Sequence, residues 1–100
     1  LNGPYESYNS GRLESKGAYK NGKPNGSWSY FHPHGAPMRD CEFKEGKLNG
    51  KSTIYDERGR VIEISNYKNN KLHGTYISYD EKTGRERMRV EYENGKATEK

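Results

Sequence analysis

The stretch Tyr19-Lys20-Asn21-Gly22-Lys23-Pro24-Asn25-Gly26 is matched, 24 positions further on, by Phe43-Lys44-Glu45-Gly46-Lys47-Leu48-Asn49-Gly50. In each copy an aromatic residue is followed after three positions by a glycine and then a lysine, and the stretch ends on Asn-Gly. Asparagine and glycine accept the positive φ that a two-residue hairpin turn requires. The stretch therefore predicts a hairpin turn that recurs along the chain.

The same spacing extends over four tandem units. Each unit begins near a glycine, at Gly3, Gly26, Gly50 and Gly74. An aromatic residue follows five positions later, at Tyr8, Phe31, Tyr55 and Tyr79. A second aromatic row lies eight positions after a turn glycine, at Tyr19, Phe43, Tyr67 and Tyr92. Only the distance between the first aromatic residue and the turn glycine varies, as expected for two strands joined by a loop of variable length.

We therefore predict an all-β fold, an elongated solenoid of four β-hairpins that form one twisted antiparallel meander sheet. The chain, residues 1–100, is interpreted as a single repeat domain with units at about 2–24, 25–48, 49–72 and 73–96. The two aromatic rows are expected to form structural ladders, with about 0.2–1 kcal/mol from each cross-strand contact. Leu1-Asn2-Gly3 matches Leu48-Asn49-Gly50, which lies inside a unit boundary, so we expect the chain to be a fragment of a longer protein.

The composition narrows the class of protein. Hydrophobic residues make up 28% of the 100 residues, and Leu, Ile, Val and Phe together number only 12. So few aliphatic side chains argue against a large closed catalytic core, whereas nine tyrosines favour strands. No apolar run is long enough to span a membrane as a helix. The single cysteine, Cys41, excludes an internal disulfide, and a net charge of +4 does not by itself indicate nucleic-acid binding.

The units resemble the MORN repeat, and more narrowly the variant found in bacterial MORN-type antitoxins, the YwqK-like family. The resemblance rests on the two quoted stretches and covers residues 1–96. It implies a non-enzymatic β-hairpin solenoid that serves as a protein-interaction module and neutralises a partner toxin. MORN-type repeats also serve as scaffolds, so the alternative is a structural segment of a larger surface or membrane-proximal protein, able to dimerise or to bind anionic lipid.

Three groups of residues are candidates for binding a protein partner across one face of the sheet. The first is an aromatic column two positions after the unit glycines, at Tyr5, Trp28 and Tyr76. In a regular strand these residues lie on the face opposite the fifth-position row, so we expect Trp28 to be partly exposed. Trp and Tyr are common interface anchors, although such a row can also do no more than stiffen its face of the sheet.

The second group is an apolar cluster on the second strands, at Met38, Ile62 and Ile64. The outer units carry charged residues at the equivalent positions, at Glu14, Lys16, Arg87 and Arg89. An apolar spot on an otherwise charged face is typical of a partner contact, and both self-association and local packing produce the same pattern.

The third group is a row of arginines on one face of the last hairpin, at Arg85, Arg87 and Arg89. Such a row fits an acidic protein surface or phosphates. Charged residues on a terminal hairpin also protect an edge strand against aggregation.

No residue pattern indicates catalysis, a cofactor or a metal site. His32 and His34 flank Pro33, but further ligands at suitable spacing do not accompany them. Cys41 has the same strand parity as Phe43, which predicts a buried, unreactive thiol. The expected partner is a protein or a second copy of the chain, with a membrane surface as a weaker alternative and without nucleic-acid binding. The sequence leaves the compartment open.

Overall fold

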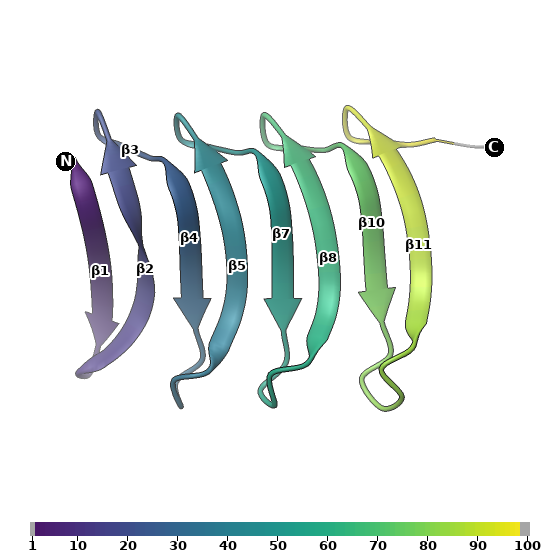
Figure 1. Ribbon diagram of the computed structural model, residues 1–100, viewed down its shortest axis with the longest axis horizontal. Helices are drawn as coiled ribbons and strands as arrows, with labels where there is room; N and C mark the ends of the chain where they lie inside the picture. The colour runs from purple at the N-terminus through teal and green to yellow at the C-terminus, as the bar shows by residue number, and fades with distance from the viewer. Residues whose placement is uncertain (1, 99–100) are drawn as a thin grey trace.

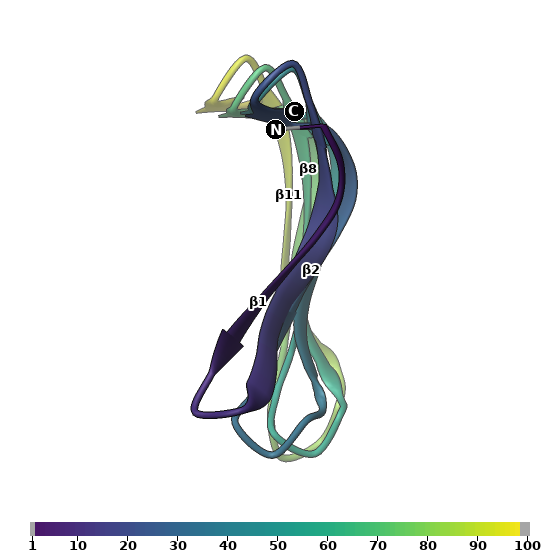
Figure 2. The ribbon, with the colours of Figure 1, turned by 90° about the vertical axis from the view of Figure 1, so that its left-hand side faces the viewer.

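The computed structural model describes residues 2–98, and they form one antiparallel sheet of twelve strands. Four hairpins lie side by side in chain order, from the N-terminus at one edge to the C-terminus at the other (Figure 1). The molecule measures 44 × 32 × 13 Å, so the sheet is a single layer. Figure 2 shows that layer from its edge, where the strands curve and the upper turns lean to one side. The predicted all-β meander of hairpins is confirmed.

Each hairpin contains two long strands and one short strand. The first strands are β1 (Gly3–Asn9), β4 (Gly26–Phe31), β7 (Gly50–Tyr55) and β10 (Gly74–Tyr79). The second strands are β2 (Arg12–Lys20), β5 (Pro37–Lys44), β8 (Val61–Lys68) and β11 (Glu86–Glu93). The short strands fold back on the second strands and are β3 (Lys23–Pro24), β6 (Lys47–Leu48), β9 (Lys71–Leu72) and β12 (Lys96–Ala97).

Two-residue turns join each second strand to its short strand at the upper end of the sheet in Figure 1. Both turn residues have positive φ, for example 53° at Asn21 and 79° at Gly22. Asn70, at φ 69°, takes the place of glycine in the third turn because asparagine tolerates this conformation. The predicted hairpin turns thus form at Asn21-Gly22, Glu45-Gly46, Asn69-Asn70 and Asn94-Gly95.

Hydrogen bonds link each upper turn to the start of its own unit. The amide of Asn21 donates to Oδ1 of Asn2 at 2.6 Å, and the same bond recurs in the next two units from Glu45 to Asn25 and from Asn69 to Asn49. In the last unit His73 takes the asparagine position, and its Nδ1 accepts from the amide of Asn94 at 3.2 Å. These bonds fix the upper turns relative to the sheet.

Every hairpin carries a β-bulge at the same place in its second strand. In the second hairpin, Tyr30 pairs with Arg39 while Phe31 pairs with Pro37, so Met38 is the extra residue. The extra residues of the four hairpins are Glu14, Met38, Ile62 and Arg87. A bulge turns the side chain of its extra residue toward the face of the residue opposite it. The bulges therefore add one side chain per hairpin to a single face of the sheet.

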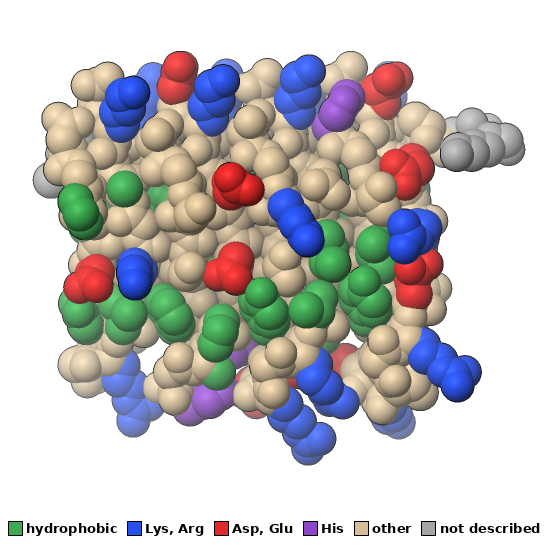
Figure 3. Space-filling view, viewed as in Figure 1, with side chains coloured by type: hydrophobic (Ala, Val, Ile, Leu, Met, Phe, Trp, Pro, Cys, Tyr) green, Lys and Arg blue, Asp and Glu red, His purple; other side chains and the backbone are tan. Residues whose placement is uncertain are grey.

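The register divides the aromatic residues between two faces. One face, here called the aromatic face, carries Tyr5, Tyr19, Trp28, Tyr30, Phe43, Tyr67, Tyr76 and Tyr92. The other, here called the banded face, carries Tyr8, Phe31, Tyr55, Tyr79 and the bulge residues. Figure 3 views the banded face, where hydrophobic side chains form a continuous band across the lower half of the sheet.

The most tightly packed part of the molecule surrounds Trp28 on the aromatic face. The indole is 4% exposed, and its Nε1 donates a hydrogen bond to the Ala18 carbonyl at 3.1 Å. Four aromatic rings lie with their centroids 5.3–6.5 Å from the indole, those of Tyr5, Tyr19, Tyr30 and Phe43. The expectation of a partly exposed Trp28 is therefore wrong, because rings from neighbouring strands cover it.

Gly17 on β2 provides the space for this packing. A Cβ atom built on Gly17 would lie 2.0 Å from Cδ2 of Trp28, so the indole lies directly over the glycine.

Leu1, on which the expectation of a longer protein partly rests, lies outside the described residues.

Candidate functional site

The middle of the banded face holds the strongest candidate for a binding surface. Seven side chains form it and are here called the apolar patch: Phe31, Met38, Tyr55, Ile62, Ile64, Ile77 and Tyr79. β5 pairs with β7 through Asp40 and Thr53, and the same register continued downward places the bulge residue Met38 beside Tyr55. By the same reasoning, the pairing of Ile64 with Ile77 places Ile62 beside Tyr79. First-strand rings and bulge side chains therefore alternate along one row.

The apolar patch is partly open to solvent. Met38 is 37% exposed, whereas Ile77 is 9% exposed and Ile64, with which it pairs, is half-buried. Met38, Tyr55 and Ile62 also line a hollow of about 470 Å³, which Arg58 and Arg60 border on the lower side. The patch thus presents apolar side chains around a shallow depression with charged residues at its rim, the arrangement found in many protein interfaces.

Polar groups hold the central ring in place. The Tyr55 hydroxyl donates to Oδ2 of Asp40 at 3.0 Å, and Ser29 Oγ donates to the other carboxylate oxygen at 2.9 Å. Burial, followed by this hydrogen bond to Asp40, raises the pKa of Tyr55. The ring is therefore fixed on the sheet surface without a buried unpaired polar atom.

Charged residues limit the apolar patch at both ends of the sheet. The bulge residue of the first hairpin is Glu14, and that of the last is Arg87. Arg89 forms an ion pair with Glu86 at 2.8 Å. Arg85 precedes β11 and lies in the loop, so the predicted strand row of three arginines is wrong and only Arg87 and Arg89 belong to the strand.

The predicted partner-binding residues do not form one surface. Met38, Ile62 and Ile64 lie on the banded face, whereas Tyr5, Trp28 and Tyr76 lie on the aromatic face. Tyr5 and Tyr76 are half-buried, and the ring of Tyr76 contacts that of Tyr92 edge-on at 6.2 Å. Combining both groups into a single contact surface is therefore wrong, since strand parity separates them.

The ladder residues also differ from the expectation of direct ring contacts along the fifth-position row. Tyr8, Phe31, Tyr55 and Tyr79 lie on alternate strands, with the intervening strands contributing Leu13, Met38 and Ile62. The row is therefore mixed aromatic and aliphatic, because a second strand always separates two first strands. The rings of Tyr19 and Phe43 instead contact Trp28 from either side on the aromatic face.

Sequence reasoning placed Phe31, Tyr55 and Tyr79 in a structural role and missed Ile77 as part of the surface. Ile77 is two positions before Tyr79 and shares its strand parity, which was the available signal. The bulges gave no such signal, because the extra residue lies within the eight-residue spacing that is the same in all four units.

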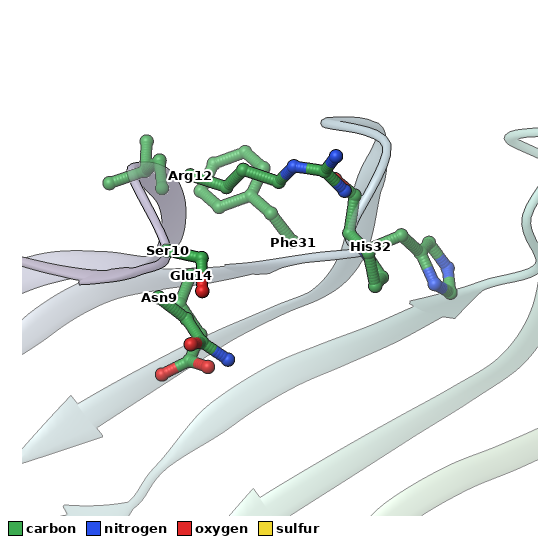
Figure 4. Close-up of a pocket in the computed structure, with 8 residues that line it drawn as sticks. Asn9, Ser10, Arg12, Glu14, Phe31 and His32 are labelled. Carbon is green, nitrogen blue, oxygen red and sulfur yellow. The ribbon is translucent and has the colours of Figure 1, made fainter.

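Side chains connect neighbouring lower loops. Arg12 Nη1 donates to the Pro33 carbonyl at 2.9 Å, and the Nε2 atom of His34 lies 2.9 Å from the Glu57 carbonyl oxygen. Figure 4 shows Arg12 extending beside Phe31 toward the next loop. Both residues line an open hollow of about 290 Å³. The Nε2 atom of His32 likewise lies 3.3 Å from the Tyr55 carbonyl oxygen, and the rings of His32 and His34 stack with their centroids 5.4 Å apart.

The chemistry of these residues does not point to catalysis. Cys41 is 3% exposed, and burial raises the pKa of its thiol. Among residues 2–98 no group of three or more His, Cys, Asp and Glu side chains is placed to hold a metal ion. In the same part of the chain no helix is long and apolar enough to cross a membrane.

A stacked array of β-hairpins with a common turn and bulge defines a repeat module. Residues 48–69, which cover most of the third hairpin, match the family model of the MORN repeat variant. No curated protein and no solved structure matches the chain. The third hairpin is thus a MORN repeat variant, and the sheet of four similar hairpins is consistent with a MORN repeat module, a class that is generally non-catalytic.

Proposed function

We propose that the chain is a non-catalytic interaction module that binds another protein across the apolar patch. The observation that carries the proposal is the alternation of apolar bulge residues and rings in the two central hairpins. In the outer hairpins Glu14 and Arg87 take the bulge position, so the apolar character is confined to the middle of the face.

The dimensions of the sheet support a protein partner. A stable protein interface covers about 800 Å² on each partner. A flat face within a sheet of 44 × 32 Å can supply that area, whereas the hollows along it are open and shallow. Exposed apolar side chains surrounded by charged ones are a property of interfaces in soluble proteins.

The test compares two methionines on opposite faces. Met38→Lys places a charge in the apolar patch, and Met88→Lys places the same charge on the aromatic face, where Met88 is 51% exposed opposite Ser78. Affinity capture from the native host, followed by a binding assay with the purified partner, measures both variants. We expect Met38→Lys to weaken binding about tenfold or more and Met88→Lys to leave it within about twofold.

Ile62→Lys, which changes the neighbouring bulge residue, serves as a second variant of the patch. Equal binding by the wild type, Met38→Lys and Ile62→Lys would refute the proposal, as would a loss of binding in Met88→Lys alone. Circular dichroism of each variant establishes that the sheet remains folded.

A narrower form of the proposal concerns the partner. The resemblance of the Asn-Gly-Lys units to bacterial MORN-type antitoxins suggests that the bound protein is a toxin that the module neutralises. Co-expression with the product of a neighbouring toxin gene tests this role, with rescue of growth as the expected result. If Met38→Lys still rescues growth, the module neutralises the toxin through a surface other than the apolar patch.

A further inference from the structure

The positive charge of the molecule is concentrated along one edge. Residues 20–23, 44–47, 68–71 and 93–96 form the four upper turns, here called the upper rim. These turns contain seven lysines and two glutamates, a net charge of +5, so the rest of the chain carries −1 of the total of +4. The lysines are Lys20, Lys23, Lys44, Lys47, Lys68, Lys71 and Lys96.

The rim lysines are exposed and available for binding. In the described part of the chain the ion pairs are Arg60 with Asp56 and Arg89 with Glu86, all outside the upper rim. Lysines flank each of the first three turns in pairs, and Lys20 pairs with Lys23 across the first turn. Figure 3 shows these blue side chains recurring along the upper margin of the sheet.

The lysines are held at a regular spacing. Successive turns contact each other, since the Gly46 amide donates to the Pro24 carbonyl at 2.9 Å and the Asn70 amide donates to the Leu48 carbonyl at 2.9 Å. A Cβ atom built on Gly46 would lie 3.5 Å from Cβ of Lys23. Because each hairpin adds two strands, the pairs recur about every 10 Å along the rim.

This spacing matches an extended peptide. A chain in the extended polyproline II conformation has three residues per turn and rises about 3.1 Å per residue, so every third side chain returns to the same face after about 9 Å. We infer that the upper rim binds an extended acidic segment of a protein, with carboxylates at about every third residue facing the lysine pairs. This surface is separate from the apolar patch and its proposed role.

Other polyanions fit the rim less well. Phosphate recognition favours the guanidinium fork of arginine, and single-stranded nucleic acid also requires exposed aromatic rings between the cations. The upper rim contains neither residue type. Membrane-surface helices and anchors combine basic residues with exposed apolar side chains, whereas the exposed large apolar residues Tyr8, Met38 and Met88 lie away from the rim.

The experiment measures fluorescence anisotropy of a labelled peptide of about twelve residues, repeating Glu-Glu-Ser, which spans the four turns when extended. We expect binding at low ionic strength that weakens as salt is raised to about 0.15 M. The triple variant Lys23→Gln, Lys47→Gln, Lys71→Gln is expected to bind about tenfold more weakly, since each exposed charge pair contributes modestly.

A matched triple variant controls for net charge. Lys16→Gln, Arg58→Gln and Lys82→Gln remove three exposed charges outside the upper rim and are expected to change the affinity by less than about twofold. Equal losses in both triple variants, or no binding at low ionic strength, would overturn the inference. A peptide of the same composition with its glutamates gathered at one end must bind more weakly, or the matched spacing is wrong. Tighter binding of anionic vesicles or single-stranded DNA through the same lysines would reassign the rim to those ligands.

Discussion

The second and third hairpins solve the same packing problem on the aromatic face in different ways. At equivalent positions of the first strand the second hairpin has Trp28 and the third has Ser52, and both side chains are almost fully buried, at 4% and 3% exposure. Trp28 fills its site with its own ring. Ser52 is too small to fill the equivalent site, so neighbouring side chains cover it, and Nε of Arg39 donates to its hydroxyl at 3.1 Å.

The comparison shows that this single-layer sheet makes its interior from side chains lying across neighbouring strands. Trp28 on β4 lies over Gly17 on β2, the neighbouring strand of the preceding hairpin. In the same way Tyr76 on β10 extends toward β8 of the preceding hairpin, where its hydroxyl donates to Glu63 at 2.7 Å. A large residue on one strand therefore requires a small or polar partner on the strand before it. Four variants examine that rule.

Removing the largest ring has the largest expected effect. Trp28→Ala deletes the indole and leaves the four surrounding rings without their common contact, so we expect the free energy of unfolding to fall by about 3–5 kcal/mol. Urea denaturation followed by circular dichroism measures the loss. Met88→Ala, at an exposed site on the same face, is the control and is expected to stay within about 0.5 kcal/mol. A small loss in Trp28→Ala would show that the cluster contributes little.

Adding one carbon beneath the ring is expected to cost less. Gly17→Ala places a Cβ where the indole lies, and we expect a loss of about 1–3 kcal/mol together with a shift of Trp28 fluorescence toward longer wavelength. The equivalent position in the third hairpin is Ser65, and Ser65→Ala should leave the fluorescence unchanged. An unshifted spectrum in Gly17→Ala would contradict the close approach of the two residues.

The polar site of the third hairpin predicts a smaller loss. Ser52→Ala removes the acceptor of the Arg39 Nε hydrogen bond, so we expect the free energy of unfolding to fall by about 0.5–1.5 kcal/mol. Ser27→Ala, at an exposed position of the second hairpin, provides the comparison in the same denaturation assay. If Ser52→Ala and Ser27→Ala have the same free energy of unfolding, the hydrogen bond from Arg39 does not contribute to stability.

The Tyr76 contact gives the protein a pH dependence that appears only in alkali. The hydrogen bond to Glu63, aided by burial, raises the pKa of Tyr76 to about 12. An unfolded tyrosine titrates near pH 10, so this contribution to stability is complete below about pH 10 and is lost as the pH rises toward about 12. Tyrosinate absorbance should reveal the delayed titration in the wild type, and Glu63→Gln should shift it to lower pH. Identical titration curves would show that Glu63 does not hold the hydroxyl.

The periodic parts of the fold were predictable from the sequence because they depend on local chemistry. Asn21 and Gly22 specify a turn through their tolerance of positive φ, and the fixed spacings specify two strands. The burial of Trp28 was not predictable in the same way, since it depends on rings from neighbouring strands. Gly17, a glycine outside the repeat pattern and inside a strand, was the signal that the ring needed space.

The candidate site was predictable only in part. Met38, Ile62 and Ile64 stood out because the outer units are charged at those positions. Their neighbours on the face could not be assigned without the register, in which Gly26 pairs with Phe43 and the two aromatic rows therefore lie on opposite faces. Residues from opposite faces were combined in one predicted surface because both aromatic rows were expected to share a face.

The bond between each upper turn and the asparagine or histidine at the start of its own unit has a consequence for how such a sheet can change in length. Because that bond closes within one unit of about 24 residues, a copy can be inserted or deleted without breaking it in the other units, while the bonds between successive turns re-form with the new neighbour. Gene duplication would then extend the reach of the sheet in steps of about 10 Å. Binding surfaces on its faces and margins would lengthen in the same increments.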